Sequence, residues 1–153
     1  MAEIRPTPDP VPRVALVCVD RGERRTAVVD ALTELAYIPD VPADAEEAVD
    51  RLRKNPYDVV VVDETFEGSS PLDNTVMKAL AATSMQVRRY IFVAQLGAGV
   101  TTLDNATAFS RSVNAVINVN DVGQLAPILR RAIADNDAFY RVFREVLQAA
   151  GRR

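Results

Sequence analysis

The amino-acid sequence predicts an α/β fold, a doubly wound five-stranded parallel sheet that ends in an extended C-terminal helix. Three observations support this prediction. Residues 59–62 are four consecutive valines, a run without alternation that indicates a strand covered on both faces. Strand-like apolar runs alternate with segments of helical apolar spacing along the chain. The last helical pattern, residues 125–149, spans about 37 Å at helical rise, more than a sheet of this size needs.

Each element has its own local signal. The predicted strands are residues 14–19, 37–41, 58–63, 90–94 and 115–119, of which the second is weakened by Pro39. The predicted helices cover residues 21–36, the segment after Asp44, and residues 72–83, 102–112 and 125–149. Glu47 stands three residues after Asp44, as in a capping box, and Pro127 suits a first helical turn. The apolar face of the helix at 102–112 would use Leu103, Ala106 and either Ala108 or Phe109.

Composition excludes several classes of function. The chain of 153 residues has a net charge of −3 and a sequence pI near 5.0, which argues against a general nucleic-acid binder. It has no histidine, which excludes the usual zinc sites and histidine-based catalytic pairs. Cys18 is the only cysteine, so no intrachain disulfide forms, and a lone cysteine in an apolar strand is typically a small hydrophobe.

The chain divides into three predicted segments. Residues 1–12 form an extended, proline-rich leader, residues 13–134 the α/β domain, and residues 135–153 a C-terminal helical extension. The leader has no apolar core of the kind a secretory signal needs, and no run approaches the ~20 apolar residues of a membrane span. We therefore expect a cytoplasmic protein without a membrane partner. The sequence leaves open whether this chain is one domain of a longer protein.

From residue 13 to 134 the chain resembles the receiver domain of two-component response regulators, a flavodoxin-like (βα)5 fold. The resemblance rests on VVVVDETFEG (59–68) and on RRTAVVDALTELAY (24–37), which is similar to the first helix of the family. It implies that Asp63 occupies the phosphoacceptor position and Gly68 that of the loop glycine. Glu67 replaces the proline that precedes this glycine.

The other positions that the resemblance assigns to phosphorylation are altered. Counted back from Asp63, the two acids that hold a divalent cation fall on Cys18 and Val19, neither of which suits Mg²⁺. Asp20 follows one residue later, a shift that turns a side chain to the other face of a strand. The phosphoryl-binding hydroxyl falls on Ala94, and the lysine falls on Asn118.

These substitutions predict a pseudo-receiver: a non-catalytic signalling module, without metal or cofactor, that acts through protein–protein contacts. The alternative is an atypical receiver that is phosphorylated on Asp63. A third interpretation, an unrelated flavodoxin-like or nucleotide-binding protein, is weak because the chain has no phosphate-loop lysine motif and no GxGxxG after the first strand. The glycines of LGAG (96–99) are typical of a simple turn.

The C-terminal extension supplies a candidate interaction surface. It carries large apolar side chains at helical spacing, namely Phe139, Tyr140, Phe143, Val146 and Leu147. On a helix longer than its own sheet, these groups would otherwise face water. The pattern therefore predicts a docking surface for another protein or for a second copy in a homodimer. The opposing interpretation is that the stripe folds back on its own domain.

Overall fold

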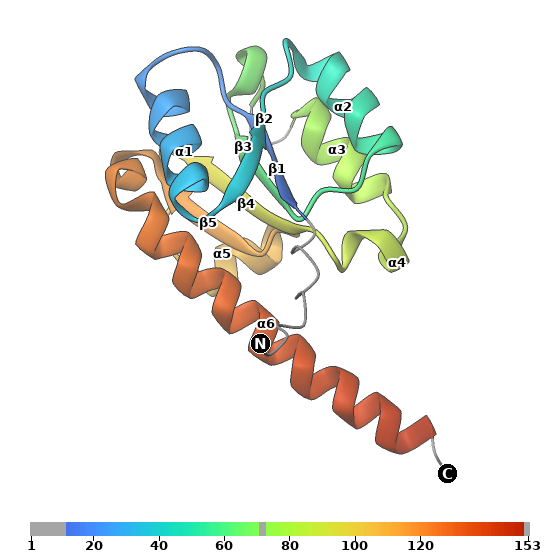
Figure 1. The fold of residues 1–153 in the computed structure, drawn as a ribbon. Coiled ribbons are helices and arrows are strands. Elements are labelled where there is room, and N and C mark those ends of the chain that lie inside the picture. Colours follow the sequence, from blue (N-terminus) through green and yellow to red (C-terminus); the bar gives the residue numbers. More distant parts are fainter. Residues whose placement is uncertain (1–11, 71–72, 152–153) are drawn as a thin grey trace, which may run out of the picture.

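The computed structural model describes residues 12–70 and 73–151, so all of the proposed leader except Pro12 lies outside the described residues. The chain folds into one parallel sheet flanked by helices (Figure 1). The strands are β1 (Arg13–Cys18), β2 (Tyr37–Asp40), β3 (Val59–Asp63), β4 (Phe92–Gly97) and β5 (Ala115–Asn118). They lie in the order β2-β1-β3-β4-β5, and every pairing is parallel. The predicted fold class is confirmed.

The helices cover both faces of the sheet. They are α1 (Glu23–Glu34), α2 (Ala45–Lys54), α3 (Thr75–Ala82), α4 (Met85–Arg88), α5 (Asn105–Ser110) and α6 (Leu125–Gly151), with 3₁₀ turns η1 (Phe66–Gly68) and η2 (Val119–Gln124). Helices α1 and α6 lie on one face, and α2, α3 and α5 lie on the other. The order of the strands reverses between β1 and β3, which defines the topological switch point of the fold.

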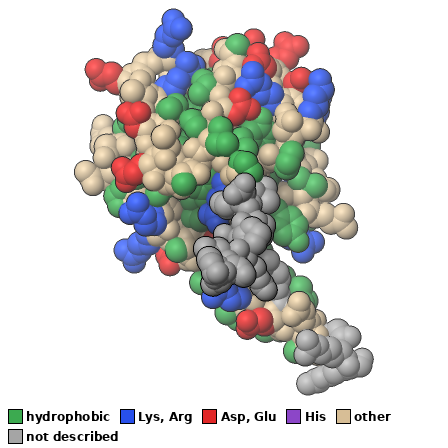
Figure 2. Space-filling view, viewed as in Figure 1, with side chains coloured by type: hydrophobic (Ala, Val, Ile, Leu, Met, Phe, Trp, Pro, Cys, Tyr) green, Lys and Arg blue, Asp and Glu red, His purple; other side chains and the backbone are tan. Residues whose placement is uncertain are grey.

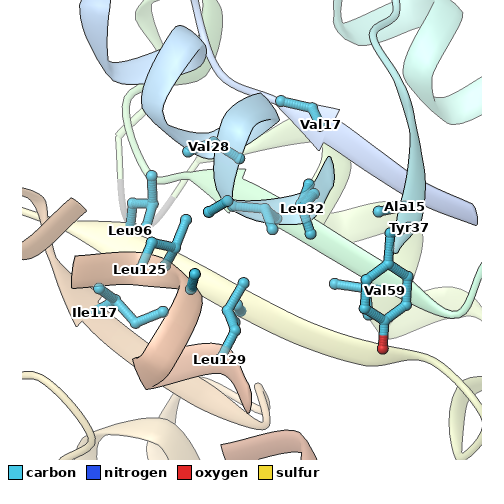
Figure 3. Packing of buried hydrophobic residues seen from close by; sticks show 14 of the residues in the cluster. Ala15, Val17, Val28, Leu32, Tyr37, Val59, Leu96, Ile117, Leu125 and Leu129 are labelled. Atoms are coloured by element: carbon cyan, nitrogen blue, oxygen red, sulfur yellow. The ribbon is translucent and has the colours of Figure 1, made fainter. Parts of the chain in front are cut away.

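The sheet separates two hydrophobic cores because successive strand residues point to opposite faces. Val59 and Val61 of β3 join the core beneath α1 and α6, whereas Val60 and Val62 join the core beneath α2, α3 and α5. Figure 3 shows the first core, in which side chains of α1 and α6 meet those of the strands. The valine run thus has no solvent-facing side, as its lack of alternation predicts.

Local signals explain where α2 and α6 begin. The Asp44 side chain accepts a hydrogen bond from the backbone N–H of Glu47, which confirms the predicted N-cap. The Glu47 carboxylate itself pairs with Arg51 one turn later. Pro127 lies in the first turn of α6, where its missing N–H costs no helical hydrogen bond. Pro39 lies in β2, an edge strand of the sheet, where a proline is tolerated.

Both predicted boundaries of the fourth strand, 90–94, are wrong, because β4 begins at Phe92 and ends at Gly97. Strand β4 runs through Gly97, so the first half of LGAG is strand and not loop. It continues this far because Leu96 pairs with Asp63 of β3 and Gly97 pairs with Asn118 of β5. The end of β4 is therefore set by pairing with the neighbouring strands and not by the position of a glycine in the sequence.

Helix α5 is shorter than the predicted helix at 102–112. Leu103 has a φ of 65° and therefore stands outside the helix, which begins after Asp104, whose carboxylate caps it. Ala108 is buried, whereas Phe109 is 88% exposed. Of the two residues proposed for the apolar face of this helix, Ala108 is therefore the buried one, and Phe109 faces solvent. The short helix α4 was not predicted separately.

Helix α6 has two halves with different surroundings. Its first half buries Leu125 and Leu129 against the sheet and packs beside α1 and η2. Its second half extends past the domain (Figure 1). At 27 residues the helix is about 40 Å long, so the expected extension is confirmed.

Candidate functional site

The carboxyl ends of β1 and β3 meet at the switch point of the sheet, where ligands of open α/β sheets bind. Asp63 is the last residue of β3 and is 3% exposed. Its Oδ2 accepts a hydrogen bond from Nη1 of Arg24 at 2.5 Å, and its Oδ1 accepts from the backbone N–H of Thr65 at 3.0 Å and from its hydroxyl at 2.8 Å. Both carboxylate oxygens therefore have partners within the chain, and the adjacent cation is a guanidinium.

Arg24 and Thr65 were missed by the sequence analysis as site residues. Arg24 lies in the first turn of α1, the helix that follows β1, and its side chain is 40% exposed. Thr65 follows Asp63 by two residues, the spacing of an Asx-type turn. The Thr65 pattern was readable from the sequence, whereas the approach of Arg24 depends on how α1 packs.

Asp20 and Asp63 have different hydrogen-bond partners. It lies beyond the end of β1, and its Oδ1 accepts from the backbone N–H of Glu67 at 2.9 Å. The Glu67 carboxylate in turn accepts from the N–H of Ala45 at the start of α2, at 2.6 Å. Glu67 adopts a left-handed backbone with φ 57°. Asp20 and Glu67 thus join three loops at this edge of the sheet.

Cys18 and Val19 point to opposite sides of the sheet. Cys18 pairs with Val62 and lies in the core beneath α2 and α3, whereas Val19 lies in the core beneath α1, the side of Asp63. Burial raises the pKa of the Cys18 thiol well above its usual range, and the negative charge of Asp40 raises it further. Cys18 is therefore a buried hydrophobe, as its strand position predicts.

The expected place of Ala94 at the end of the fourth strand is wrong. Ala94 lies in the middle of β4, fully buried and paired with Val61, because β4 continues through Gly97. The β4 residue paired with Asp63 is Leu96, which is also buried and carries no hydroxyl. The hydroxyl that contacts Asp63 belongs to Thr65, from the loop after β3.

Asn118 ends β5, one residue before the predicted end of this strand, and among the described contacts it has none with Asp63. Its amide donates to the carbonyl oxygens of Val100 (2.8 Å) and Ala98 (3.3 Å), and its Oδ1 accepts from the N–H of Asn120 at 2.9 Å. It therefore caps η2 and holds the loop after β4. Where the resemblance places a lysine, this asparagine therefore binds only local backbone groups.

A divalent cation of the kind receiver domains hold does not fit these residues. Magnesium prefers several oxygen ligands, but Cys18 points to the opposite face of the sheet, Val19 is apolar and the Asp63 carboxylate is paired with Arg24. Asp20 lines the same groove, and its carboxylate accepts from the backbone of Glu67. Within residues 12–70 and 73–151, no group of three or more His, Cys, Asp or Glu side chains is arranged to bind a metal. A groove of about 570 Å³ nevertheless remains open beside Asp63 and Arg24.

A second buried carboxylate follows directly after Asp63. Glu64 is 7% exposed, and its carboxylate accepts from Nη1 of Arg111 at 2.8 Å and from the N–H of Ala98 at 3.1 Å. Arg111 also donates to Oε1 of Gln95 at 3.0 Å. Gly97 permits this approach, since a Cβ there would lie 2.8 Å from Oε2 of Glu64. Asp63 and Glu64 are thus each paired with an arginine, on opposite faces of the sheet.

The C-terminal half of α6 exposes an apolar face. Phe139, Phe143, Val146 and Leu147 are 66%, 45%, 61% and 50% exposed, and Tyr140 is half-buried. Hydrophobic side chains are visible on this projecting part of the helix (Figure 2). Tyr140, Phe143 and Leu147 line a small pocket with Arg89 and Tyr90 of the domain, whereas Phe139 and Val146 are the most exposed residues of the predicted stripe. No helix among the described residues is long and apolar enough to cross a membrane.

No protein-family model matches the chain, and no curated protein sequence is significantly similar to it. Solved structures share its fold. The receiver domain of a sensor histidine kinase from Pseudomonas aeruginosa, solved with magnesium in its active-site cleft, is 19% identical, with 81% of this chain and 99% of that chain covered and a TM-score of 0.61. The N-terminal domain of a response regulator/sensory box/GGDEF protein from Carboxydothermus hydrogenoformans is 17% identical, with 84% and 99% covered and a TM-score of 0.61.

A further similar structure is a trimeric coiled-coil segment of yeast Spc42 fused to another solved structure. It is 18% identical, with 93% of this chain and 91% of that chain covered and a TM-score of 0.63. At these identities the comparisons establish the fold. The chain therefore has the α/β fold of response-regulator receiver domains, with a long C-terminal helix.

Proposed function

We propose that this chain is a receiver-like signalling module that is not an enzyme, does not depend on phosphorylation, and acts through contacts with other proteins. The observation that carries the proposal is the state of Asp63. Its two oxygens are occupied by Arg24 and Thr65, so the charge that a metal ion would balance is balanced by a guanidinium of the same chain. The receiver domain from Pseudomonas aeruginosa, by contrast, was solved with magnesium in its active-site cleft.

The alternative is an atypical receiver that accepts a phosphoryl group on Asp63. One observation favours it: Asp63 lines an open groove, and the side chain of Arg24 is sufficiently exposed to turn away. An arginine beside the acceptor would then stabilise the phosphoryl charge. Against it stand Val19, Leu96 and Asn118, which supply neither a metal ligand nor a contact to the phosphoryl group.

Intact-mass measurement separates these two functions. The protein is incubated with acetyl phosphate and Mg²⁺, beside an Asp63→Asn control that lacks the acceptor carboxylate. We expect no added phosphoryl mass in either protein, and none in Arg24→Gln, because removing the guanidinium restores no metal ligand. A stoichiometric mass increase that disappears in Asp63→Asn would establish the alternative.

The surface proposed for protein contacts is the apolar face of the C-terminal half of α6, and its occupant is a second copy of this chain. The face that buries Leu125 and Leu129 in the domain continues into Phe143 and Leu147 beyond it. An exposed apolar face of this kind is typical of helices that pair with other helices.

The fused coiled-coil structure also supports pairing through α6. The match leaves out roughly 11 of the 153 residues of this chain, fewer than the 19 residues from 135 to 153, so it includes part of the extension. In that structure the named segment is a trimeric coiled coil.

Light scattering over a concentration series tests the association. The intact chain is expected to form dimers at high concentration, and the chain truncated after Asp135 to stay monomeric. Phe139→Ser/Val146→Ser is expected to behave like the truncated chain, whereas Ile38→Ser, which changes a 53% exposed residue of β2, is the matched control. A monomeric intact chain at every concentration would contradict the proposal.

A further inference from the structure

A second groove, of about 940 Å³, lies between α3, α4 and the end of α5, on the sheet face away from Asp63. Its floor includes Gln95 of β4, and Tyr140 of α6 contributes to one side. The size is within the range of ligand sites in proteins. The proposals above do not use this groove.

The groove is basic although the protein as a whole is acidic. Lys78, Arg88, Arg89 and Arg111 line it, and none of the described lining residues is Asp or Glu. The chain carries a net charge of −3. The acidic residues gather elsewhere: a separate groove over α2 is lined by Asp44, Glu46, Glu47 and Asp50. The segregation of charge favours an anionic ligand in the basic groove.

Two of the four cations have no carboxylate partner among the described residues. Arg111 pairs with Glu64 and Lys78 pairs with Asp73, but within the described residues no carboxylate pairs with Arg88 or Arg89. Arg88 is held in place, because it donates to the carbonyl oxygens of Ile91 and Ser112 and to the side chain of Asn114.

The charge of Arg88 is also poorly solvated. Burial lowers the pKa of this guanidinium from its ordinary value. Among the described residues, three of its five N–H groups have protein acceptors, and the other two are open to a ligand oxygen. A fixed, partly desolvated arginine is well suited to binding a carboxylate.

Apolar groups at the rim make the groove amphipathic. Phe109 of α5 is 88% exposed and Met85 of α4 is 72% exposed, and both line it. Neither packs into the hydrophobic cores of the domain. A ligand that combines negative charge with apolar side chains would cover both kinds of surface.

We propose that this groove binds an acidic, amphipathic peptide segment of a partner protein, with carboxylates on Arg88 and Arg89 and apolar side chains on Phe109 and Met85. A nucleic acid suits the groove less well, because two of its four cations are already paired and its rim is apolar. The inference shares with the proposed function only the expectation of a protein partner. Its failure would leave the tests on Asp63 and α6 unaffected.

Fluorescence anisotropy tests this site with the full chain and a fluorescein-labelled peptide of repeating Glu-Glu-Leu units. The control probes are the same peptide with Gln for Glu, and a labelled single-stranded oligonucleotide. Arg88→Gln/Arg89→Gln removes the two groove cations to which the proposal assigns carboxylates, and Phe109→Ser removes the exposed aromatic ring of the groove. The matched control is Arg53→Gln/Lys54→Gln, which removes two cations on α2, neither of which lines the groove.

We expect the acidic peptide to bind and the Gln peptide not to bind. The groove double variant should weaken binding about tenfold, since each charge contributes modestly, and Phe109→Ser should weaken it as well. The α2 variant should bind as the unmodified chain does. The inference is overturned if the acidic peptide does not bind, if both peptides bind equally, if the groove variants bind normally, or if the oligonucleotide binds more tightly than the peptide.

Discussion

The switch-point edge of the sheet and the C-terminal half of α6 differ in whether their side chains have partners within the domain. At the sheet edge, the charged groups are paired: Asp63 with Arg24, Glu64 with Arg111, and Asp20 with the backbone of Glu67. On α6, large apolar groups such as Phe139 and Val146 remain exposed. Internal pairing leaves the edge little free capacity for chemistry, whereas the helix retains surface for association. This difference is the basis of the proposed function through protein–protein contacts.

The largest expected difference is in the free energy of unfolding when an aspartate replaces a valine in the sheet or on α6. Val61→Asp should destabilise the fold by several kcal/mol, because it buries an unpaired carboxylate between two helix layers. Val142→Asp, at a side chain 59% exposed on α6, should change the free energy of unfolding by less than about 0.5 kcal/mol. Urea unfolding of both variants measures this. Equal losses would mean that α6 is as buried in solution as the sheet.

The two arginine pairs at the end of β3 should differ in their contribution to stability. Glu64→Ala should cost about 2 kcal/mol, because it leaves Arg111 and the N–H of Ala98 without their acceptor. Asp63→Ala should cost about 1 kcal/mol, since Arg24 is 40% exposed and turns to solvent. Thermal or urea unfolding provides the comparison. A larger loss for Asp63→Ala would mean that Arg24 is more firmly held than its exposure indicates.

Stability should fall at alkaline pH because of Cys18. Burial raises the pKa of its thiol, so above the ordinary thiol pKa of about 8.5 only the unfolded chain releases the proton. The contribution of the buried thiol is therefore fully present below that pH and is lost as the pH rises, by up to about 1.4 kcal/mol per pH unit. Urea midpoints from pH 7 to about 9.5 should decline less steeply in Cys18→Ala. Identical slopes would show that other groups, such as Tyr57, cause the decline.

The smallest expected effect is that of removing the end of α6. Truncation after Asp135 should change the free energy of unfolding of the monomer by less than about 0.5 kcal/mol, because the helix half it removes is mostly exposed. The measurement is a urea titration at a concentration where the intact chain is monomeric. If the truncated chain unfolds, the apolar stripe of α6 belongs to the core of the domain and is not a free surface.

The sequence predicted most of the fold because its signals were local. The valine run, the Asp44 cap and the apolar stripe of α6 depend only on neighbours along the chain, and each is present where expected. The end of β4 was misplaced by three residues because Leu96 and Gly97 are held by pairing with β3 and β5, which no local pattern contains. The same misplacement put Ala94 at a strand end instead of in the middle of one.

By itself, the sequence determined the parallel sheet, the position of Asp63 at the end of its third strand and the excess length of the last helix. Their causes are apolar periodicity and helix caps, which act over a few residues. Only the tertiary structure decided which partners the carboxylates have. Arg24 lies 39 residues from Asp63 and Arg111 lies 47 from Glu64, and each pair forms because helix packing brings the arginine to the strand end. The basic groove was likewise not predicted from the sequence, since Lys78, the Arg88–Arg89 pair and Arg111 come from three different helices that only the packed fold brings together.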